Sequence, residues 1–386
     1  MMVPPSPHGA SRGRFGPDTA SAPAQSAGAI SPVPDHAKWG WALRSLSPAE
    51  SYLDPRAPSA APRVGDVIVV RIEKIGYHSS IVGTDNRKVH LYPGDTVVGV
   101  LGHRYATDAF EGEVDELTDL SLLTAGGMIG TVRSAHREMG RSTSVTFVGS
   151  VVGADSEPIN LKDHLFHPVA TGMADGAGPL LVVVGTGMNA GKTTVVSQTL
   201  HGLHRQGLRV AAGKLTGSVS NRDVDEMRSA HAVSVVDFSD YGFPSTYLSA
   251  PGELSALGRE ILAVSAARHP DLTVLEIADG VLQRETAMIL RDPEFRERVS
   301  GVLLAADSPL AALGALQELR TLGYSVLGVS GAITSSPLYV REFEARSNVP
   351  VLSSTGVGTE LAQRVRDGLA GLGERAAPAP TLSPAA

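Results

Sequence analysis

One short stretch of this chain has residue types and spacing suited to phosphate chemistry: residues 180 to 194 read LLVVVGTGMNAGKTT. An apolar run stops at a glycine-rich turn, and the turn ends in Gly191, Lys192 and Thr193. In such a turn the backbone N–H groups point at a phosphate, the lysine reaches the terminal phosphates, and the threonine hydroxyl can ligate Mg²⁺. We therefore expect nucleoside triphosphate binding by Gly185, Thr186, Gly187, Asn189, Ala190, Gly191, Lys192, Thr193 and Thr194.

The spacing of this loop departs from the usual phosphate-binding pattern, in which four residues separate the two glycines. Thr186 stands where the first glycine is usual, with Gly185 and Gly187 on either side of it. The apolar run before the loop still indicates a buried strand that leads into it. The alternative is a helix that merely happens to begin with Gly-Lys.

Acidic residues follow two further apolar stretches that we interpret as strands of the same parallel sheet. Because ligands bind outside the carboxyl ends of such strands, these residues should share one crevice. Mg²⁺ prefers hard oxygen ligands, and Glu276, flanked by apolar residues, is costly to bury without a cation nearby. We expect Glu276 to be one magnesium ligand and either Asp223 or Asp225 to be a second. Alternatively, the two aspartates lie on a solvated helix start, where acids favour the helix dipole.

Lys214 follows the apolar segment 209 to 213 and is a candidate catalytic residue beside Lys192. Its ammonium group could stabilise charge on a transferring phosphoryl group or hold a substrate carboxylate. An ordinary solvent-exposed lysine is the alternative. Residues 237 to 247 combine acids, hydroxyls and aromatic rings, which suits a substrate loop and a structural turn about equally. His103 and Arg104 could contact an anion, although such residues more often pack or face solvent.

The elements that position these residues begin at residue 180, where apolar runs alternate with amphipathic stretches. This rhythm predicts a P-loop NTPase-type α/β domain over residues 180–373, with a mostly parallel sheet and helices on both faces. The predicted helices cover residues 193–206, 252–268, 310–322 and 359–372. The predicted strands cover residues 180–185, 208–213, 233–238, 272–277, 300–306, 325–330 and 349–353.

The part of the chain before residue 180 has a different character. Residues 1–61 are rich in Pro, Ala and Ser, which predicts a disordered segment in which Trp39 and Trp41 could dock locally. Residues 63–168 contain short β-type runs separated by turn residues, which predicts a small β-rich domain. Residues 169–179 are expected to form a linker, and residues 374–386 a disordered tail.

Composition excludes several classes of function. The 386 residues suit about two domains and carry a formal net charge of −7, which gives no reason to expect nucleic acid as a partner. The chain contains no cysteine, so disulfides, thiolate metal sites and thiol nucleophiles are excluded. No segment suits a signal peptide or a membrane span, and we expect a cytoplasmic protein with no membrane partner.

The order of these motifs resembles dethiobiotin synthetase and related P-loop enzymes that activate carboxylates and form amides. Those enzymes also have Gly-Thr before the loop, a lysine after the second strand, and a run like Glu-Ile-Ala-Asp-Gly at 276 to 280. The resemblance implies ATP and Mg²⁺ as cofactors. It assigns phosphate and substrate contacts to Lys192 and Lys214, and Mg²⁺ binding to Thr193, Asp223 and Glu276. Where the relatives often place an adenine-recognising Asn, this chain has residues 331 to 334, Gly-Ala-Ile-Thr.

The chain also resembles P-loop proteins related to D-glutamate N-acetyltransferase, which join an N-terminal domain to a similar P-loop domain. The first resemblance implies an ATP-dependent ligase acting on a carboxylate or carbamate of a small metabolite. The second implies transfer of an acyl group from an acyl-CoA donor to an amino acid. A nucleotide-dependent switch or chaperone is a third alternative. The expected partners are a small-molecule substrate, an amino acid or a carboxylic acid among the candidates, and a second copy of the chain in a homodimer.

Overall fold

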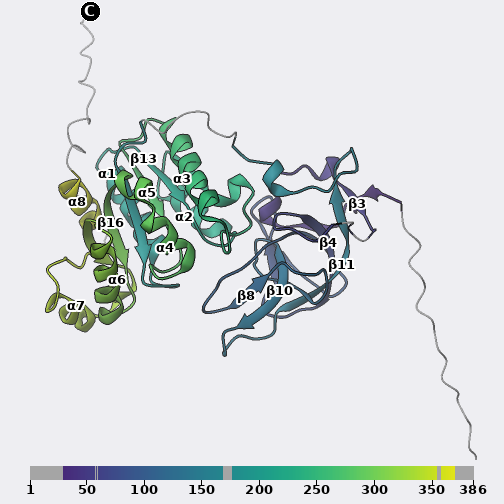
Figure 1. Cartoon of the computed structure of the whole chain (residues 1–386), viewed down its shortest axis with the longest axis horizontal. Helices are drawn as coiled ribbons and strands as arrows, with labels where there is room; N and C mark the ends of the chain where they lie inside the picture. The colour runs from purple at the N-terminus through teal and green to yellow at the C-terminus, as the bar shows by residue number, and fades with distance from the viewer. Residues whose placement is uncertain (1–28, 57, 59, 168–175, 354–357, 370–386) are drawn as a thin grey trace, which may run out of the picture.

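The computed structural model describes residues 29–56, 58, 60–167, 176–353 and 358–369. Figure 1 shows a β-rich part built from the first half of the chain beside an α/β part built from the second half. Most of the predicted linker, the whole predicted tail, and residues 1–28 lie outside the described residues. None of the helices in the described ranges is long and apolar enough to cross a membrane.

The α/β part is organised around a six-stranded sheet in which every neighbouring pair of strands is parallel. The order across the sheet is β14-β13-β15-β12-β16-β17. The predicted strand at 349–353 does not form, and Val351 makes only an isolated bridge to Val329. The bounds are β12 Leu180–Gly185, β13 Val210–Lys214, β14 Ser234–Asp237, β15 Leu272–Glu276, β16 Val299–Ala305 and β17 Val326–Ser330.

Helices cover both faces of this sheet, as predicted. Side chains alternate along β12, so that Leu181 and Val183 pack against α1, α2 and α8, while Val182 and Val184 face α3 and α6. The short helices α2, α4, α5 and α7 were not predicted, because each has too few turns to show a clear period. The bounds are α1 Lys192–Arg205, α2 Asn221–Ser229, α3 Pro251–Ala266, α4 Arg284–Arg291, α5 Pro293–Arg298, α6 Pro309–Thr321, α7 Pro337–Glu344 and α8 Thr359–Gly368.

The β-rich part contains a nine-stranded, mainly antiparallel sheet and a separate hairpin of β5 and β6. The main path through the sheet is β1-β3-β11-β4-β7-β10-β8. The bounds are β1 Ser31–Pro32, β2 Lys38–Trp39, β3 Tyr52–Asp54, β4 Val67–Lys74, β5 Ser80–Val82, β6 Lys88–His90, β7 Thr96–Leu101, β8 Phe110–Glu113, β9 Leu120–Leu122, β10 Met128–Ala135 and β11 Thr143–Val152.

The prediction of disorder up to residue 61 is wrong for residues 31–54, which add three strands to this sheet. Trp41 is buried in the core of the β-rich part together with Leu43 and Val98. Composition alone could not predict this result, because the few apolar residues of the segment pack into a core that later strands supply.

The two parts contact each other through polar groups at the carboxyl-end side of the parallel sheet. Arg44 forms a buried ion pair with Asp240 and also donates to the Ser239 hydroxyl at 3.0 Å. The Tyr247 hydroxyl donates to Glu111 at 3.0 Å. Gly126 has no room for a side chain, because a Cβ there would lie 2.8 Å from the Val219 carbonyl oxygen. The junction is therefore a close, specific packing of one part against the other.

Replacing Arg44 with alanine should destabilise the protein substantially. The substitution leaves the buried Asp240 carboxylate without its cation, beside Asp237, whose pKa burial and Asp240 together raise to about 6. Urea denaturation should show a loss of about 3 kcal/mol in the free energy of unfolding. The matched control is Arg56→Ala, which breaks a pair whose arginine is 55% exposed and should cost far less stability than the loss of Arg44. Equal losses for the two variants would contradict the anchoring role of Arg44.

Candidate functional site

The loop between β12 and α1 has the conformation of a phosphate-binding loop. Asn189 and Gly191 both adopt left-handed backbone angles, with φ of 60° and 94°, and Gly191 directly precedes the first residue of α1. This combination turns the chain sharply, so that the N-terminus of α1 follows the loop with its N–H groups unpaired by the helix. Such a terminus favours a bound anion.

Neighbouring strands brace this loop from both sides. The amide of Val281, after β15, donates to the Gly185 carbonyl at 2.9 Å, and the amide of Ala332, after β17, donates to the Ala190 carbonyl at 3.0 Å. Gly331 approaches so closely that a Cβ there would lie 2.1 Å from the Ala190 oxygen. The loop is therefore held in shape by the sheet that carries it.

Lys192 lies inside the loop. Its ammonium group is buried and donates to the Gly187 carbonyl at 2.8 Å. Burial lowers the pKa of Lys192, while the nearby carboxylates of Asp279 and Glu276 act in the opposite direction. The side chain thus lies inside the loop, and its contact with a bound phosphate stays a prediction.

Thr193, Lys214, Asp223 and Glu276 come together beside the loop, although they belong to four different elements. The Thr193 hydroxyl lies 3.1 Å from Asp223 Oδ1 and 3.4 Å from Glu276 Oε1. Lys214 forms an ion pair with Asp223, and its Nζ lies 3.5 Å from Glu276 Oε1. The register of the sheet causes this meeting, because Lys214 and Glu276 are direct partners on β13 and β15.

The charges in this cluster depend on one another. Burial alone would lower the pKa of Lys214, but the carboxylates of Asp223 and Glu276 outweigh that effect and raise it. Burial favours a high pKa for Asp223, but Lys214 and the Thr193 hydroxyl bring it below its usual value. Glu276 is the most deeply buried of the four, and burial raises its pKa. One lysine thus compensates two buried carboxylates.

This cluster fits the ligand set that Mg²⁺ would need. Glu276 Oε2 is buried without a hydrogen-bond partner, so one acidic oxygen is left for a cation. No group of three His, Asp or Glu side chains within the described residues could hold a metal alone. A set of one hydroxyl and two carboxylates suits Mg²⁺, which usually completes its coordination with water and phosphate oxygens.

Asp225, the competing candidate ligand, points elsewhere. Its Oδ2 accepts hydrogen bonds from Asn86 at 2.8 Å and from Asn221 at 3.2 Å, so it joins α2 to the β-rich part. Asp223, one half-turn earlier on α2, contacts Thr193 and Lys214. The structure therefore places Asp223 in the cluster, and it does not place Asp225 there.

The other predicted loop residues have separate contacts. The Thr186 hydroxyl donates to Asp307 at 3.1 Å, and the Asn189 amide donates to Asp108 of the β-rich part at 2.7 Å. Ala190 is buried, and Thr194 is exposed on the first turn of α1.

Residues 237–247 belong mostly to the junction, through Asp240 and Tyr247. Most contacts of this segment are therefore those expected of a structural turn and not of a substrate loop.

A cavity of about 280 Å³ opens next to the cluster, between the two parts of the molecule. Its wall includes Lys214, Asp223 and Asp279 from the α/β part. His78, Arg104 and Tyr105 of the β-rich part line it as well. Sequence reasoning noted Arg104 only as a weak anion candidate beside His103. His103 instead accepts a hydrogen bond from the Val114 amide. Asp279 belongs to the Glu-Ile-Ala-Asp-Gly run and Tyr105 follows Arg104, but neither was given a role, and no signal in the sequence pointed to His78.

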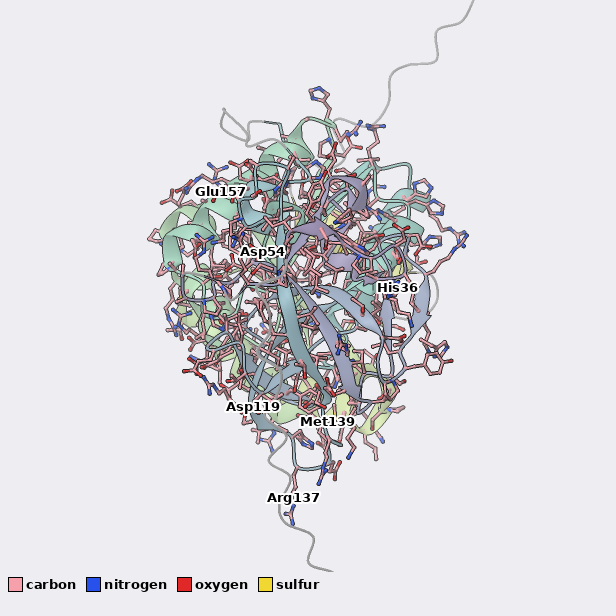
Figure 2. The ribbon with its side chains drawn as sticks, turned by 90° about the vertical axis from the view of Figure 1, so that its right-hand side faces the viewer. His36, Asp54, Asp119, Arg137, Met139 and Glu157 are labelled. Carbon is pink, nitrogen blue, oxygen red and sulfur yellow. The ribbon has the colours of Figure 1, made fainter. Side chains whose placement is uncertain are left out.

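A larger cavity of about 670 Å³ lies elsewhere on the molecule and includes Asp54 and Glu157 in its wall. Figure 2 views the molecule from the side of the β-rich part, with the α/β part behind it, and labels both residues. It shares no lining residue with the cavity beside the cluster. The smaller cavity is therefore the one positioned for chemistry at a bound nucleotide.

Comparisons with known proteins give a distant structural likeness. No protein-family model matches the sequence, and a search of curated proteins also finds no match. The signal recognition particle receptor FtsY from Elizabethkingia anophelis is 17% identical with a TM-score of 0.34, over 55% of this chain and 75% of that chain. Chloroplast FtsY from Physcomitrella patens is 15% identical with a TM-score of 0.34, over 54% of this chain and 72% of that chain.

The kinase domain of Escherichia coli tyrosine kinase ETK is 16% identical with a TM-score of 0.29, over 40% of this chain and 67% of that chain. Because all three scores are low, the P-loop fold rests on the strand, loop and helix geometry described above. None of these three neighbours is a dethiobiotin synthetase or an N-acetyltransferase, so both resemblances stay predictions.

Removing the cluster's cation should destabilise the protein in a pH-dependent way. Lys214→Ala removes the main cation that compensates the buried carboxylates of Asp223 and Glu276, which should cost about 3 kcal/mol in the free energy of unfolding at pH 7. Without Lys214, burial raises the folded-state pKa of Asp223 above its unfolded value, so the variant loses stability as pH rises through that range. Denaturation curves should therefore show a larger deficit at pH 8 than at pH 4.

The matched control is Lys162→Ala, which removes a lysine that is 42% exposed in its pair with Glu253. We expect that variant to lose about 0.5 kcal/mol or less, with little change between the two pH values. A deficit of Lys214→Ala that is independent of pH would contradict the charge compensation described here.

Thr193→Ala should weaken the dependence of nucleotide binding on Mg²⁺. It removes the hydroxyl that lies beside both carboxylates, so the Mg²⁺ concentration needed for half-maximal binding of an ATP analogue should rise about tenfold. Ser197→Ala is the control, because that hydroxyl lies one turn further along α1 and donates to the Thr194 carbonyl. Titration of Mg²⁺ at fixed analogue concentration measures both. An unchanged midpoint for Thr193→Ala would count against this metal site.

Proposed function

We propose that this protein is an ATP- and Mg²⁺-dependent enzyme that phosphorylates a carboxylate or carbamate of a small metabolite for amide-type bond formation. The observation that carries the proposal is the cavity beside the phosphate-binding loop, which Lys214 and Asp223 line together with groups of the β-rich part. This arrangement supplies a phosphate site and an acceptor site that open onto each other.

The residues of the loop would bind the nucleotide phosphates. Its backbone N–H groups and Lys192 would compensate their negative charge, and Thr193, Asp223 and Glu276 would hold Mg²⁺. When bound, Mg²⁺ neutralises charge on the terminal phosphates. The bracing of the loop by Val281 and Ala332 keeps these groups positioned before the nucleotide arrives, which lowers the cost of reorganisation.

In the proposed reaction, an oxygen of the acceptor carboxylate forms a bond to the γ-phosphorus of ATP. The bond between that phosphorus and the bridging oxygen breaks, and ADP leaves. An amine then attacks the acyl carbon of the mixed anhydride and loses a proton, and inorganic phosphate departs with its electron pair. Lys214, held between Asp223 and Glu276, would face the transferring group from the cavity side.

The dimensions of the cavity favour a small acceptor. A volume of about 280 Å³ is close to the lower end of the range for small-molecule sites. The acidic residues beside Lys192 favour phosphoryl transfer, because they could hold a metal ion. The alternative, acyl transfer from an acyl-CoA, does not need metal ligands.

One contact favours the nucleotide-dependent switch as a second candidate. Asn189 of the loop donates to Asp108 of the β-rich part, so a nucleotide in the loop would act on the junction directly. A switch would change its association state with nucleotide and would show no turnover stimulated by a small acceptor. Sedimentation with and without an ATP analogue separates the two candidates.

Lys192→Ala should abolish acceptor-stimulated ADP release. The variant removes the buried ammonium group in the loop, and we expect the rate to fall at least about a hundredfold. ADP release is measured with Mg-ATP and pools of small carboxylic acids and amino acids. Lys88→Ala, which changes an exposed lysine of β6, is the control and should keep the full rate. Stimulated release that survives in Lys192→Ala would overturn the proposed mechanism.

A further inference from the structure

We propose that Arg104 is the receptor for a second anionic group of the acceptor, so that the β-rich part selects a dicarboxylate. This inference rests on the proposed function and deepens it, because it names the class of substrate and the residue that recognises it. It begins from an arginine that lines the cavity beside the phosphate-binding loop and forms no ion pair with any acidic side chain in the described part of the chain.

The contacts of Arg104 leave most of its guanidinium unused. Nη1 donates to the Leu123 carbonyl and lies 3.4 Å from His78 Nε2. Nε is buried without a hydrogen-bond partner, and no hydrogen bond or ion pair of Nη2 occurs within the described ranges. A guanidinium in such a position normally pairs with a carboxylate or phosphate, because its desolvation is costly when no anion compensates it.

The charged and titratable groups around Arg104 do not supply that anion. Asp108 and Asp279 attract it through space, but neither forms an ion pair with it, and Asp108 accepts a hydrogen bond from Asn189. Burial and the adjacent guanidinium lower the pKa of His78 to about 4, so its ring is neutral at pH 7. Burial and nearby carboxylates raise the pKa of Tyr105, so its hydroxyl group in the cavity lining is neutral at that pH.

The opposite wall of the cavity differs in this respect. Lys214 also lines it, but Asp223 and Glu276 already compensate its charge. A bound acceptor would therefore place its reacting carboxylate towards Lys214 and the nucleotide, and its second carboxylate at Arg104. The fork of a guanidinium matches a carboxylate in two parallel hydrogen bonds, which gives geometric selectivity as well as attraction.

Calorimetric titration of the full chain tests this inference, with Mg²⁺ and a non-hydrolysable ATP analogue present. The probes are succinate, glutarate and adipate, with butyrate as the monocarboxylate control. We expect wild type to bind at least one dicarboxylate more tightly than butyrate. Arg104→Gln should weaken that binding about 10- to 100-fold while the affinity for the ATP analogue stays within about threefold.

Two further variants keep the test specific. Arg104→Lys retains the charge without the fork and should bind the dicarboxylate with an affinity between those of wild type and Arg104→Gln. Arg71→Gln changes an exposed arginine of β4 and should bind it like wild type. Equal dicarboxylate binding by wild type and Arg104→Gln, or no preference of wild type for any dicarboxylate over butyrate, would overturn the inference.

This titration, read together with the ADP-release assay in Mg-ATP, separates this inference from the proposed function. Dicarboxylate binding that depends on Arg104 without any ADP release would uphold the receptor and reject phosphoryl transfer. If an acceptor stimulates ADP release equally in wild type and in Arg104→Gln, phosphoryl transfer would be upheld and the receptor role of Arg104 rejected.

Discussion

The structure of the site depends on the burial of one lysine between two carboxylates. Lys214 and Glu276 stand opposite each other on neighbouring strands, and Asp223 reaches them from the first turn of α2. None of these charges could be buried alone at acceptable cost, so each one requires the other two. The Thr193 hydroxyl joins this group from the start of α1 and ties it to the phosphate-binding loop. Sheet register, loop geometry and the predicted metal ligands are thereby linked in one cluster.

The β-rich part gives this cluster a second wall. An isolated P-loop sheet would expose the carboxyl ends of its strands to solvent, whereas here Arg44, Asn86 and Asp108 each contact a different segment of that edge. The contacts of Asn86 and Asp108 reach α2 and the loop itself, close to the residues expected to bind phosphate and metal. The cavity left between the two walls joins the chemistry of one part to the recognition groups of the other.

Sequence reasoning found the P-loop sheet and the cluster because both rest on local patterns. An apolar strand before Gly-Lys-Thr and acids at strand ends are visible in the order of residues alone. Spacing could not separate Asp223 from Asp225, since only the docking of Asn86 against α2 shows which one faces Thr193. Arg104 was recognised only as a weak anion candidate beside His103, because its neighbours in the cavity come from distant parts of the chain. Residues 31–54 were misjudged for the same reason: their core is supplied by strands that follow much later.

The most direct test of the account is a crystal structure of the full chain with Mg²⁺ and a non-hydrolysable ATP analogue. We predict the triphosphate in the loop at 185–191, a metal ion in contact with Thr193 and with Asp223 or Glu276, and a terminal phosphate that faces the cavity lined by Arg104. A nucleotide bound elsewhere, or a terminal phosphate directed away from that cavity, would contradict it.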